Sequence, residues 1–229
     1  MINTGDSIRR SSAGLLSTLG WTDASGTPTY CLEGSLFNAG TVVQWLRDGL
    51  QIIEQADEVN ALAQSVPDSG GVMLVPAFTG WGTPHWDPQA RGVLVGLTRD
   101  SNRGHIARAA LEGIALSVAT LVELAGEALG HGLGELAVDG GAAASDPLLQ
   151  AQADSTGLTV RRPRNLESTA RGIALFAGVQ CGLIPDLSAI AAHREDDVQR
   201  FEPQINTERR RHQRDRWNDA VNRSLGWHG

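Results

Sequence analysis

The sequence predicts an α/β domain in which helices pack against strands. Two observations carry this prediction: strand-like runs open the chain, and strand-like and helical patterns then alternate to its end. With 229 residues, 41% of them hydrophobic, the chain has enough apolar material for a large core. Since neither an internal repeat nor a low-complexity linker divides it, we expect one domain over residues 1–229.

The first predicted elements are two short strands, at residues 15–21 and 29–36. The turn-rich stretch TDASGTP separates them, which is typical of a small antiparallel meander. The pattern becomes helical after Asn38, where apolar residues recur every three or four positions through TVVQWLRDGLQII. A second helical stretch, ADEVNALAQSV, ends before Pro67.

The longest predicted helix runs from about Asn102 to Gly130, with apolar residues at alternating steps of four and three along one face. Asp100, Ser101 or Asn102 can cap its start, and Gly130 can end it. The other predicted elements are strands in GGVMLVPAF, GVLVGL, LAV and LTVRRP and helices that begin near Ser145, Thr169 and Thr207.

The composition excludes several classes of function. A formal net charge of -7 gives no general attraction for nucleic acid or for an anionic membrane, so we expect neither partner. All 19 basic residues are arginines, and a Walker A phosphate loop needs a lysine, so that route to a nucleotide is closed. The chain contains neither HExxH nor CxxC, which argues against a catalytic metal cage.

The same features predict a cytoplasmic protein. No apolar run approaches the roughly 20 residues that span a bilayer, and the opening residues lack the apolar centre of a signal peptide. Cys31 and Cys181 lie far apart, so we expect reduced thiols rather than a disulfide.

One candidate phosphate site is the break in LAVDGGAAASDPLLQ at Gly140 and Gly141. Glycine permits backbone angles and a close approach that side chains would block. Ser145 is a good N-cap and Pro147 is tolerated in a first helical turn, so a helix start with free amides would favour an anion here. The same pattern fits an ordinary tight turn, and these residues alone do not decide between the two.

The stretch FNAGTVVQWLRD repeats this arrangement, with an extended run, Gly40, and a helix that carries Gln44 one turn later. Two such turns in one domain could clasp a nucleotide from both sides. Each alone also fits a purely structural role, because glycine before a helix is common.

Two other polar stretches fit a structural role better than a functional one. His85 and Asp87 lie in PAFTGWGTPHWDPQARG, whose tryptophans, prolines and glycines favour a rigid packed loop over a metal or acid–base site. The C-terminal ERRRHQRDR leads into Trp217, Val221 and Leu225 at helical spacing, so we interpret it as the solvated basic face of a closing helix. A nucleic-acid patch is the weaker alternative.

Five stretches occur in the order in which the FGGY carbohydrate kinases carry them. They are YCLEGSLFNAGTVVQWLRD, VPAFTGWGTPHWDPQARGVLVGLTR, HIARAALEGIA, VDGGAAASDPLLQAQAD and ESTARGIALFAG. The segment from Gly92 to Glu112 also fits the second signature of that family. The chain therefore resembles the C-terminal domain of these kinases over essentially its whole length, and PAFTGWGTPHWD resembles the glycerol-kinase branch rather than the pentulose kinases.

The resemblance implies an actin-like, ribonuclease H-like ATPase domain with a mixed sheet flanked by helices. In such proteins ATP, with Mg2+, lies in a cleft between two similar domains. The residues that we expect to bind the nucleotide are Gly40, Gln44, Gly140, Gly141 and Ser145. Ser145 is a departure, because the family has an asparagine there and a hydroxyl cannot present an amide.

The resemblance also implies ATP-dependent phosphorylation of glycerol to glycerol 3-phosphate by the complete protein. In the family, the general base, the polyol contacts and much of the metal site precede the stretch that matches Met1, so we assign no catalytic or metal-binding residue here. Half a cleft cannot hold an in-line geometry, so we expect this chain alone to bind ATP or ADP weakly and not to phosphorylate glycerol. We also expect an unpaired strand edge and self-association as a homo-oligomer.

Two alternatives stay open. The chain could be the C-terminal half of another FGGY sugar kinase, because this half contacts ATP and not the sugar. It could also be a stand-alone nucleotide-binding module that needs a partner chain.

Overall fold

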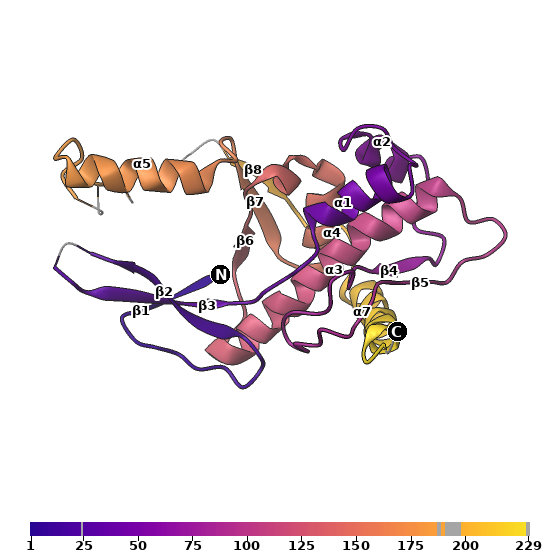
Figure 1. Cartoon of the computed structure of the whole chain (residues 1–229), viewed down its shortest axis with the longest axis horizontal. Coiled ribbons are helices and arrows are strands. Elements are labelled where there is room, and N and C mark those ends of the chain that lie inside the picture. Colours follow the sequence, from indigo (N-terminus) through magenta and orange to yellow (C-terminus); the bar gives the residue numbers. More distant parts are fainter. Residues whose placement is uncertain (24, 187–188, 191–197, 228–229) are drawn as a thin grey trace.

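Helix α3, Arg103–Leu129, forms the axis of the molecule in the computed structural model, and elements from before and after it in the chain pack against it (Figure 1). The structure describes residues 1–23, 25–186, 189–190 and 198–227. The Asn102 side chain caps α3 by accepting hydrogen bonds from the N–H groups of Gly104 and His105. Gly130 ends the helix in the left-handed conformation, with a φ of 75°. Both ends therefore confirm the predicted boundaries.

Small side chains on α3 let its neighbours approach closely. A Cβ atom at Gly113 would lie 2.2 Å from the carbonyl oxygen of Leu74, so only glycine fits where strand β4 (Met73–Val75) packs on the helix. Alanines surround this point, and Ala107 and Ala110 are fully buried. They belong to a core that joins α3 to the helices on either side of it.

A three-stranded antiparallel sheet packs near the C-terminal end of α3. Its strands are β1 (Ile2–Gly5), β2 (Leu16–Thr22) and β3 (Pro28–Glu33), in the order β1-β3-β2. Strands β2 and β3 confirm the predicted meander. The sequence does not predict β1, because its residues INTG include only one large apolar side chain.

Three short helical segments follow and cover α3. Helix α1 (Gly40–Gln44) continues as a π-helix, η1 (Trp45–Gly49), and α2 (Glu58–Gln64) comes next. Val42 and Leu46 from the first two segments are fully buried in the core on α3. The predicted helix after Asn38 is thus confirmed as far as Gly49, but not to Ile53, and it changes to a π-helix, a rare geometry that is frequent at functional sites.

The second sheet consists of β4 and β5 (Val93–Val95), paired antiparallel. Helix α7 (Thr207–Ser224) covers it. Trp217 of α7 is 1% exposed and packs edge-on against Trp81, with ring centroids 6.2 Å apart. The predicted closing helix is therefore confirmed, and it buries its apolar face.

The third sheet lies beside α4 (Asp146–Thr156). Its strands are β6 (Glu135–Ala137), β7 (Thr159–Pro163) and β8 (Val198–Phe201), with β6 and β7 parallel and β8 antiparallel to β7. Helix α5 (Ser168–Gln180) extends away from the body of the molecule, and none of its residues is buried (Figure 1). The sequence does not predict β8.

The predicted α/β class is confirmed, with the strands distributed over three small sheets rather than one. The mixed pairing that we expect occurs within β6, β7 and β8. Strands β1 and β6 are edge strands, and both line an apolar groove of about 380 Å³ whose floor includes Val118 and Leu121 of α3.

Helix α3 is long and apolar enough, by composition alone, to cross a membrane. It is not an uninterrupted apolar run, because Arg108, Glu112 and Glu123 interrupt it. Of its most apolar window, 56% is buried inside the protein, so the composition of α3 is that of a core helix.

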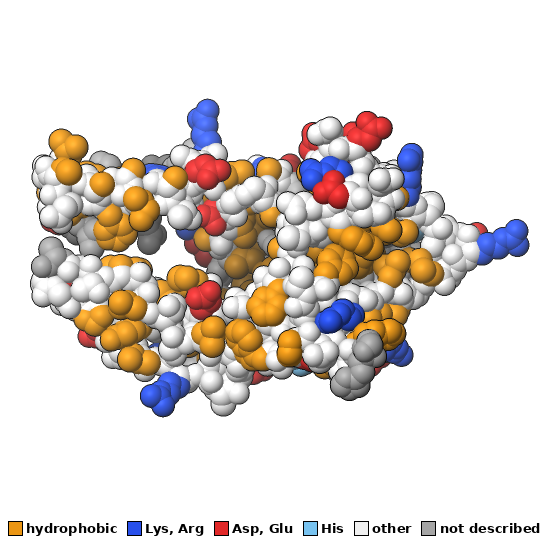
Figure 2. Space-filling model, in the orientation of Figure 1, with side chains coloured by type: hydrophobic (Ala, Val, Ile, Leu, Met, Phe, Trp, Pro, Cys, Tyr) orange, Lys and Arg blue, Asp and Glu red, His pale blue; other side chains and the backbone are white. Residues whose placement is uncertain are grey.

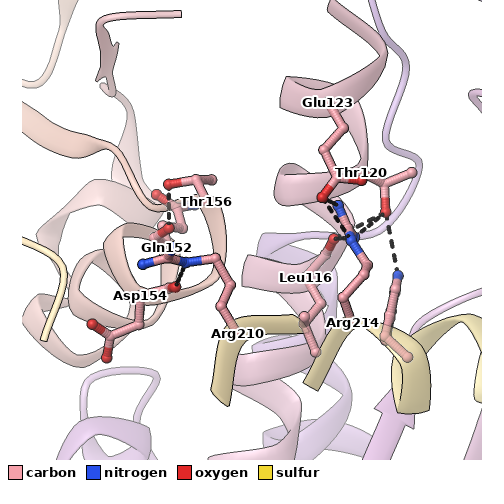
Figure 3. Close-up of polar contacts among 9 residues, drawn as sticks. Leu116, Thr120, Glu123, Gln152, Asp154, Thr156, Arg210 and Arg214 are labelled. Carbon is pink, nitrogen blue, oxygen red and sulfur yellow. Dashed lines mark hydrogen bonds and ion pairs between the residues drawn. The ribbon is translucent and has the colours of Figure 1, made fainter. Parts of the chain in front are cut away.

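The arginine run of α7 corrects another expectation, because it is not merely a solvated face (Figure 3). Arg214 donates hydrogen bonds to Thr120 at 3.0 Å and to Glu123 at 2.8 Å, both on α3. Arg210 donates from Nε to the backbone oxygen of Asp154 on α4 at 2.7 Å. The arginines therefore hold α7 against α3 and α4, which helical spacing alone does not reveal.

The loop that contains His85 and Asp87 is packed, in agreement with its structural interpretation. The Asp87 carboxylate accepts hydrogen bonds from the N–H groups of Gln89 and Gly226 at 2.8 and 2.7 Å, which ties the loop to the end of α7. The His85 ring lies 5.9 Å from that of Trp81. Burial lowers the pKa of His85 below its usual value of 6.5, and the Asp87 charge acts in the opposite direction.

Candidate nucleotide site

The backbone between β6 and α4 forms an exposed turn that begins at Gly140. This residue has a φ of 78° and a ψ of 175°, a conformation that essentially only glycine adopts, and a 3-10 helix, η2 (Gly141–Ala144), follows. Gly141 has no positive φ, and a Cβ atom there would meet nothing within 4 Å. Backbone conformation thus explains the first glycine but not the second, whereas a ligand close to the backbone would explain both.

Two backbone N–H groups are free at this turn. Within the described ranges, those of Gly141 and Ala142 have no hydrogen-bond acceptor, whereas those of Ala143 and Ser145 are bonded inside the turn at 3.0 and 3.2 Å. Ser145 is the N-cap of α4, and its hydroxyl accepts a hydrogen bond from the N–H of Leu148 at 3.2 Å. Free N–H groups and the positive end of a helix together favour an anion.

An arginine from β7 holds the turn in place. Arg162 donates from Nη1 to the backbone oxygen of Ala143 at 2.7 Å, and its Nη2 pairs with Asp146 at 2.8 Å. The N–H of Gly140 donates to the oxygen of Leu166 at 2.9 Å. These contacts fasten the turn to the sheet and leave the free N–H groups open. The pattern LTVRRP gives no signal for this role, because it does not say where an arginine points.

Ser145 also joins α4 to α2. Its hydroxyl donates to Oδ1 of Asn60 at 2.5 Å while it accepts from Leu148. The hydroxyl therefore uses both its hydrogen and a lone pair. The sequence does not single out Asn60, because one polar residue on a short helix carries no functional signal.

Gly40 and Gln44, the second predicted pair, lie on α1. Gly40 is the first residue of the helix, it is exposed, and a Cβ atom there would meet nothing within 4 Å. Glycine costs a helix about 1 kcal/mol relative to alanine, and no contact of the described residues accounts for it here. The Gln44 side chain is exposed and has no hydrogen-bond partner among the described residues.

A buried asparagine fixes the approach to Gly40. Asn38 is 3% exposed, donates from Nδ2 to Thr79 at 3.1 Å and accepts at Oδ1 from Thr41 at 3.2 Å. Buried polar groups need such partners, so this pair of bonds sets the start of α1 relative to the loop after β4.

The two groups of predicted residues lie on neighbouring helices of one core. Val42 of α1 and Leu148 of α4 belong to the same buried cluster on α3, and Figure 1 shows both helices on that axis. The structure brings together Gly140, Gly141 and Ser145 in one turn and places Gly40 and Gln44 on α1, which packs against the same core. Among the described residues, no hydrogen bond or ion pair joins the two groups directly.

A polar cavity of about 290 Å³ lies elsewhere, between α3, α4 and α7, and includes none of the predicted site residues. The candidate site is instead an open surface, as one wall of a cleft would be. In the part of the chain that the structure describes, no three His, Cys, Asp or Glu side chains gather as a metal site.

Comparison with known proteins identifies the family. Residues 1–181 match the FGGY family of carbohydrate kinases, C-terminal domain. The glycerol kinases of Pseudothermotoga lettingae and Aromatoleum aromaticum are 49% and 50% identical to this chain over 227 residues, or 99% of its length. The chain spans 45% of the length of each of these relatives.

Solved structures agree with this match. The Plasmodium falciparum glycerol kinase with ADP superposes with a TM-score of 0.85 and 32% identity, over 98% of this chain and 44% of that chain. A xylulose kinase from Lactobacillus acidophilus, 24% identical, shares the fold with a TM-score of 0.65, over 95% of this chain and 45% of that chain. The predicted actin-like ATPase fold is thereby confirmed. The chain belongs to the FGGY family of carbohydrate kinases and corresponds to the C-terminal domain of that family.

Proposed function

We propose that this chain is the ATP-binding half of a glycerol kinase. In the complete protein, the terminal phosphoryl group of ATP would pass to glycerol and give glycerol 3-phosphate. The observation that carries the proposal is the turn at Gly140–Ala144, where two free N–H groups meet the start of a helix. The choice of glycerol is supported by relatives about half identical to this chain that are glycerol kinases.

Each site residue has a role in this proposal. The N–H groups of Gly141 and Ala142 donate to phosphate oxygens, and the absence of a side chain at Gly141 lets the phosphate come close. Gly140 shapes the turn, and Ser145 caps the helix behind it. Gly40 and Gln44 form the second wall of the proposed nucleotide site.

We assign the groups that carry out phosphoryl transfer to residues other than these. Mg2+ neutralises phosphate charge when it is bound, but we assign no residue of this chain to it, since the described residues offer no cluster of acidic ligands. The general base and the polyol contacts are likewise assigned to the rest of the complete protein. We also assign the protein to the cytosol. A kinase needs the ATP found there, and the two cysteines are free thiols, as is usual in that compartment.

A chimeric enzyme tests whether this chain can serve as the ATP-binding half of a glycerol kinase. The part of the Pseudothermotoga lettingae glycerol kinase that this chain does not match would be fused ahead of residue 1, and ATP-dependent phosphorylation of glycerol and of xylulose would be measured. We expect glycerol to be phosphorylated and xylulose not. Gly141→Ala should lower the rate by about tenfold or more, because it blocks contacts to the transferring phosphate.

The matched control is Gly126→Ala on α3, where a Cβ atom has room. A folded chimera that phosphorylates neither compound, or one that Gly141→Ala leaves fully active, would overturn the proposal. The alternative of a stand-alone module predicts a defined complex with a separate chain, which native mass spectrometry of the protein purified from its source would detect.

A further inference from the structure

Asn60 has one end of its side-chain amide fixed and the other end free. Its Oδ1 accepts the hydrogen of the Ser145 hydroxyl at 2.5 Å. Its Nδ2 has no hydrogen-bond partner among the described residues. The side chain is neither buried nor fully exposed, so the NH2 group remains within reach of a ligand.

The orientation of the amide follows from what Ser145 already does. The Ser145 oxygen accepts a hydrogen bond from the N–H of Leu148, so its own hydrogen still needs an acceptor. Oδ1 of Asn60 supplies that acceptor. Turning the amide over would leave the hydroxyl hydrogen without a partner, which costs free energy in a partly buried site.

The fixed amide lies close to the phosphate turn. The N–H of Ser145 bonds to the oxygen of Ala142 at 3.2 Å, so Asn60 contacts a residue one helical turn from the free N–H groups. A molecule whose phosphates occupy those N–H groups has only to extend past Ser145 to meet the NH2 group.

Charge decides which part of a nucleotide reaches Asn60. Three exposed acidic residues, Glu54, Asp57 and Glu58, lie at the start of α2, and like charge disfavours phosphate there. A neutral base carries no such penalty. The ring nitrogens of a purine are acceptors, and the free NH2 group of Asn60 is a donor.

We propose that Asn60 donates a hydrogen bond to the purine base of the bound nucleotide, with Ser145 as the residue that positions its amide. This inference rests on the proposed function, because it needs a nucleotide on the turn. It gives Asn60 the amide donor that a serine hydroxyl at position 145 cannot present.

The test compares two isosteric variants of the whole chain. Asn60→Asp keeps an acceptor for the Ser145 hydroxyl and loses both N–H donors of the amide. The control, Asn222→Asp, makes the same charge change at an exposed position of α7, remote from the turn. Binding of ADP and of inorganic pyrophosphate would be measured by ligand-detected NMR. Asn60→Asp should weaken ADP binding by about threefold to tenfold, the worth of one hydrogen bond, and leave pyrophosphate binding unchanged.

The outcomes separate the two proposals. Equal ADP affinity of Asn60→Asp and Asn222→Asp would overturn the role of Asn60. So would an equal loss of ADP and pyrophosphate binding by Asn60→Asp, because that pattern indicates charge repulsion or a structural change rather than a lost base contact. Absence of ADP binding by the parent chain would overturn the proposed function and, with it, this inference.

Discussion

Two adjacent glycines at the start of η2 owe their identity to different causes. Gly140 is fixed by its backbone, with a φ of 78°. Gly141 is fixed neither by its backbone nor by neighbouring atoms, since the space beside it is empty to 4 Å. Stability therefore accounts for one glycine, and our proposal assigns the other to nucleotide binding.

Alanine substitutions should separate these causes. Gly140→Ala places a side chain in a conformation that essentially only glycine adopts, so it should lower the free energy of unfolding by about 1–3 kcal/mol. Gly141→Ala should change it by less than about 0.5 kcal/mol. Urea unfolding measures both, and a large loss of stability in Gly141→Ala would show that folding, not binding, requires that glycine.

His85 should make stability depend on pH. Its pKa is lowered in the folded protein because it is partly buried, so the unfolded chain binds the proton more readily. Stability should therefore fall as the pH falls through the ordinary value of 6.5. The free energy of unfolding of His85→Gln should decrease less than that of the parent between about pH 7 and pH 5. Parallel pH profiles would contradict this.

At the residue scale, the sequence predicts the glycines and the cap of the candidate site but not their supports. A glycine pair before a serine is a local pattern, so it can be recognised in the chain itself. Arg162 and Asn60 act on the turn from β7 and α2, across 19 and 85 positions of sequence. No local pattern reveals such contacts, because they depend on how the elements pack.

At the scale of elements, helix α3 and strand β4 pack so closely that only glycine fits at position 113. Gly113→Ala would bring a Cβ atom to 2.2 Å from the backbone of β4, so the helix or the strand must shift. We expect a loss of about 1–3 kcal/mol or more in the free energy of unfolding.

The control for this prediction lies on the same helix. At Gly126 the nearest atom to an added Cβ is 3.4 Å away, so Gly126→Ala should be neutral or stabilise by up to about 1 kcal/mol through helix propensity. Thermal unfolding followed by circular dichroism compares the two variants. Equal midpoints would mean that α3 and β4 do not pack as closely as described.

The length of an element decides how well the sequence predicts it. The 27 residues of α3 repeat their pattern over many turns, and both caps are local, so its bounds are predicted closely. Strands β1 and β8 have four residues each and offer no period to recognise. In the π-helix after α1, a Cβ atom at Gly49 would lie 2.8 Å from the Trp45 ring, a close contact that the apolar spacing does not encode.

At the scale of the whole molecule, apolar surface is left uncovered at one end. Helix α5 exposes Ile173 at 68%, and β2 exposes Leu19 at 56%. Figure 2 shows hydrophobic side chains on α5 and on the meander across an open gap. Among the described residues, the edge strands β1 and β6 also have no strand partner on one side. Such surfaces and edges favour association with another chain.

We therefore expect the chain to self-associate as its concentration rises. Ile173→Glu should reduce this association, because it places a charge on the uncovered face of α5. Gln180→Glu adds the same charge at an exposed polar position of that helix and serves as the control. Sedimentation velocity measures the effect. A monomer at every concentration tested, or equal behaviour of both variants, would contradict the prediction.

A titration of the chain with ADP tests most directly whether it is a nucleotide-binding half. Binding should saturate with a dissociation constant of about 1 mM, or about -4 kcal/mol, because one wall of a cleft supplies only part of the contacts. Gly141→Ala should weaken it severalfold while it leaves unfolding unchanged. ADP binding that never saturates, or an affinity that Gly141→Ala does not alter, would contradict the assignment of the Gly140–Ala144 turn as the phosphate site.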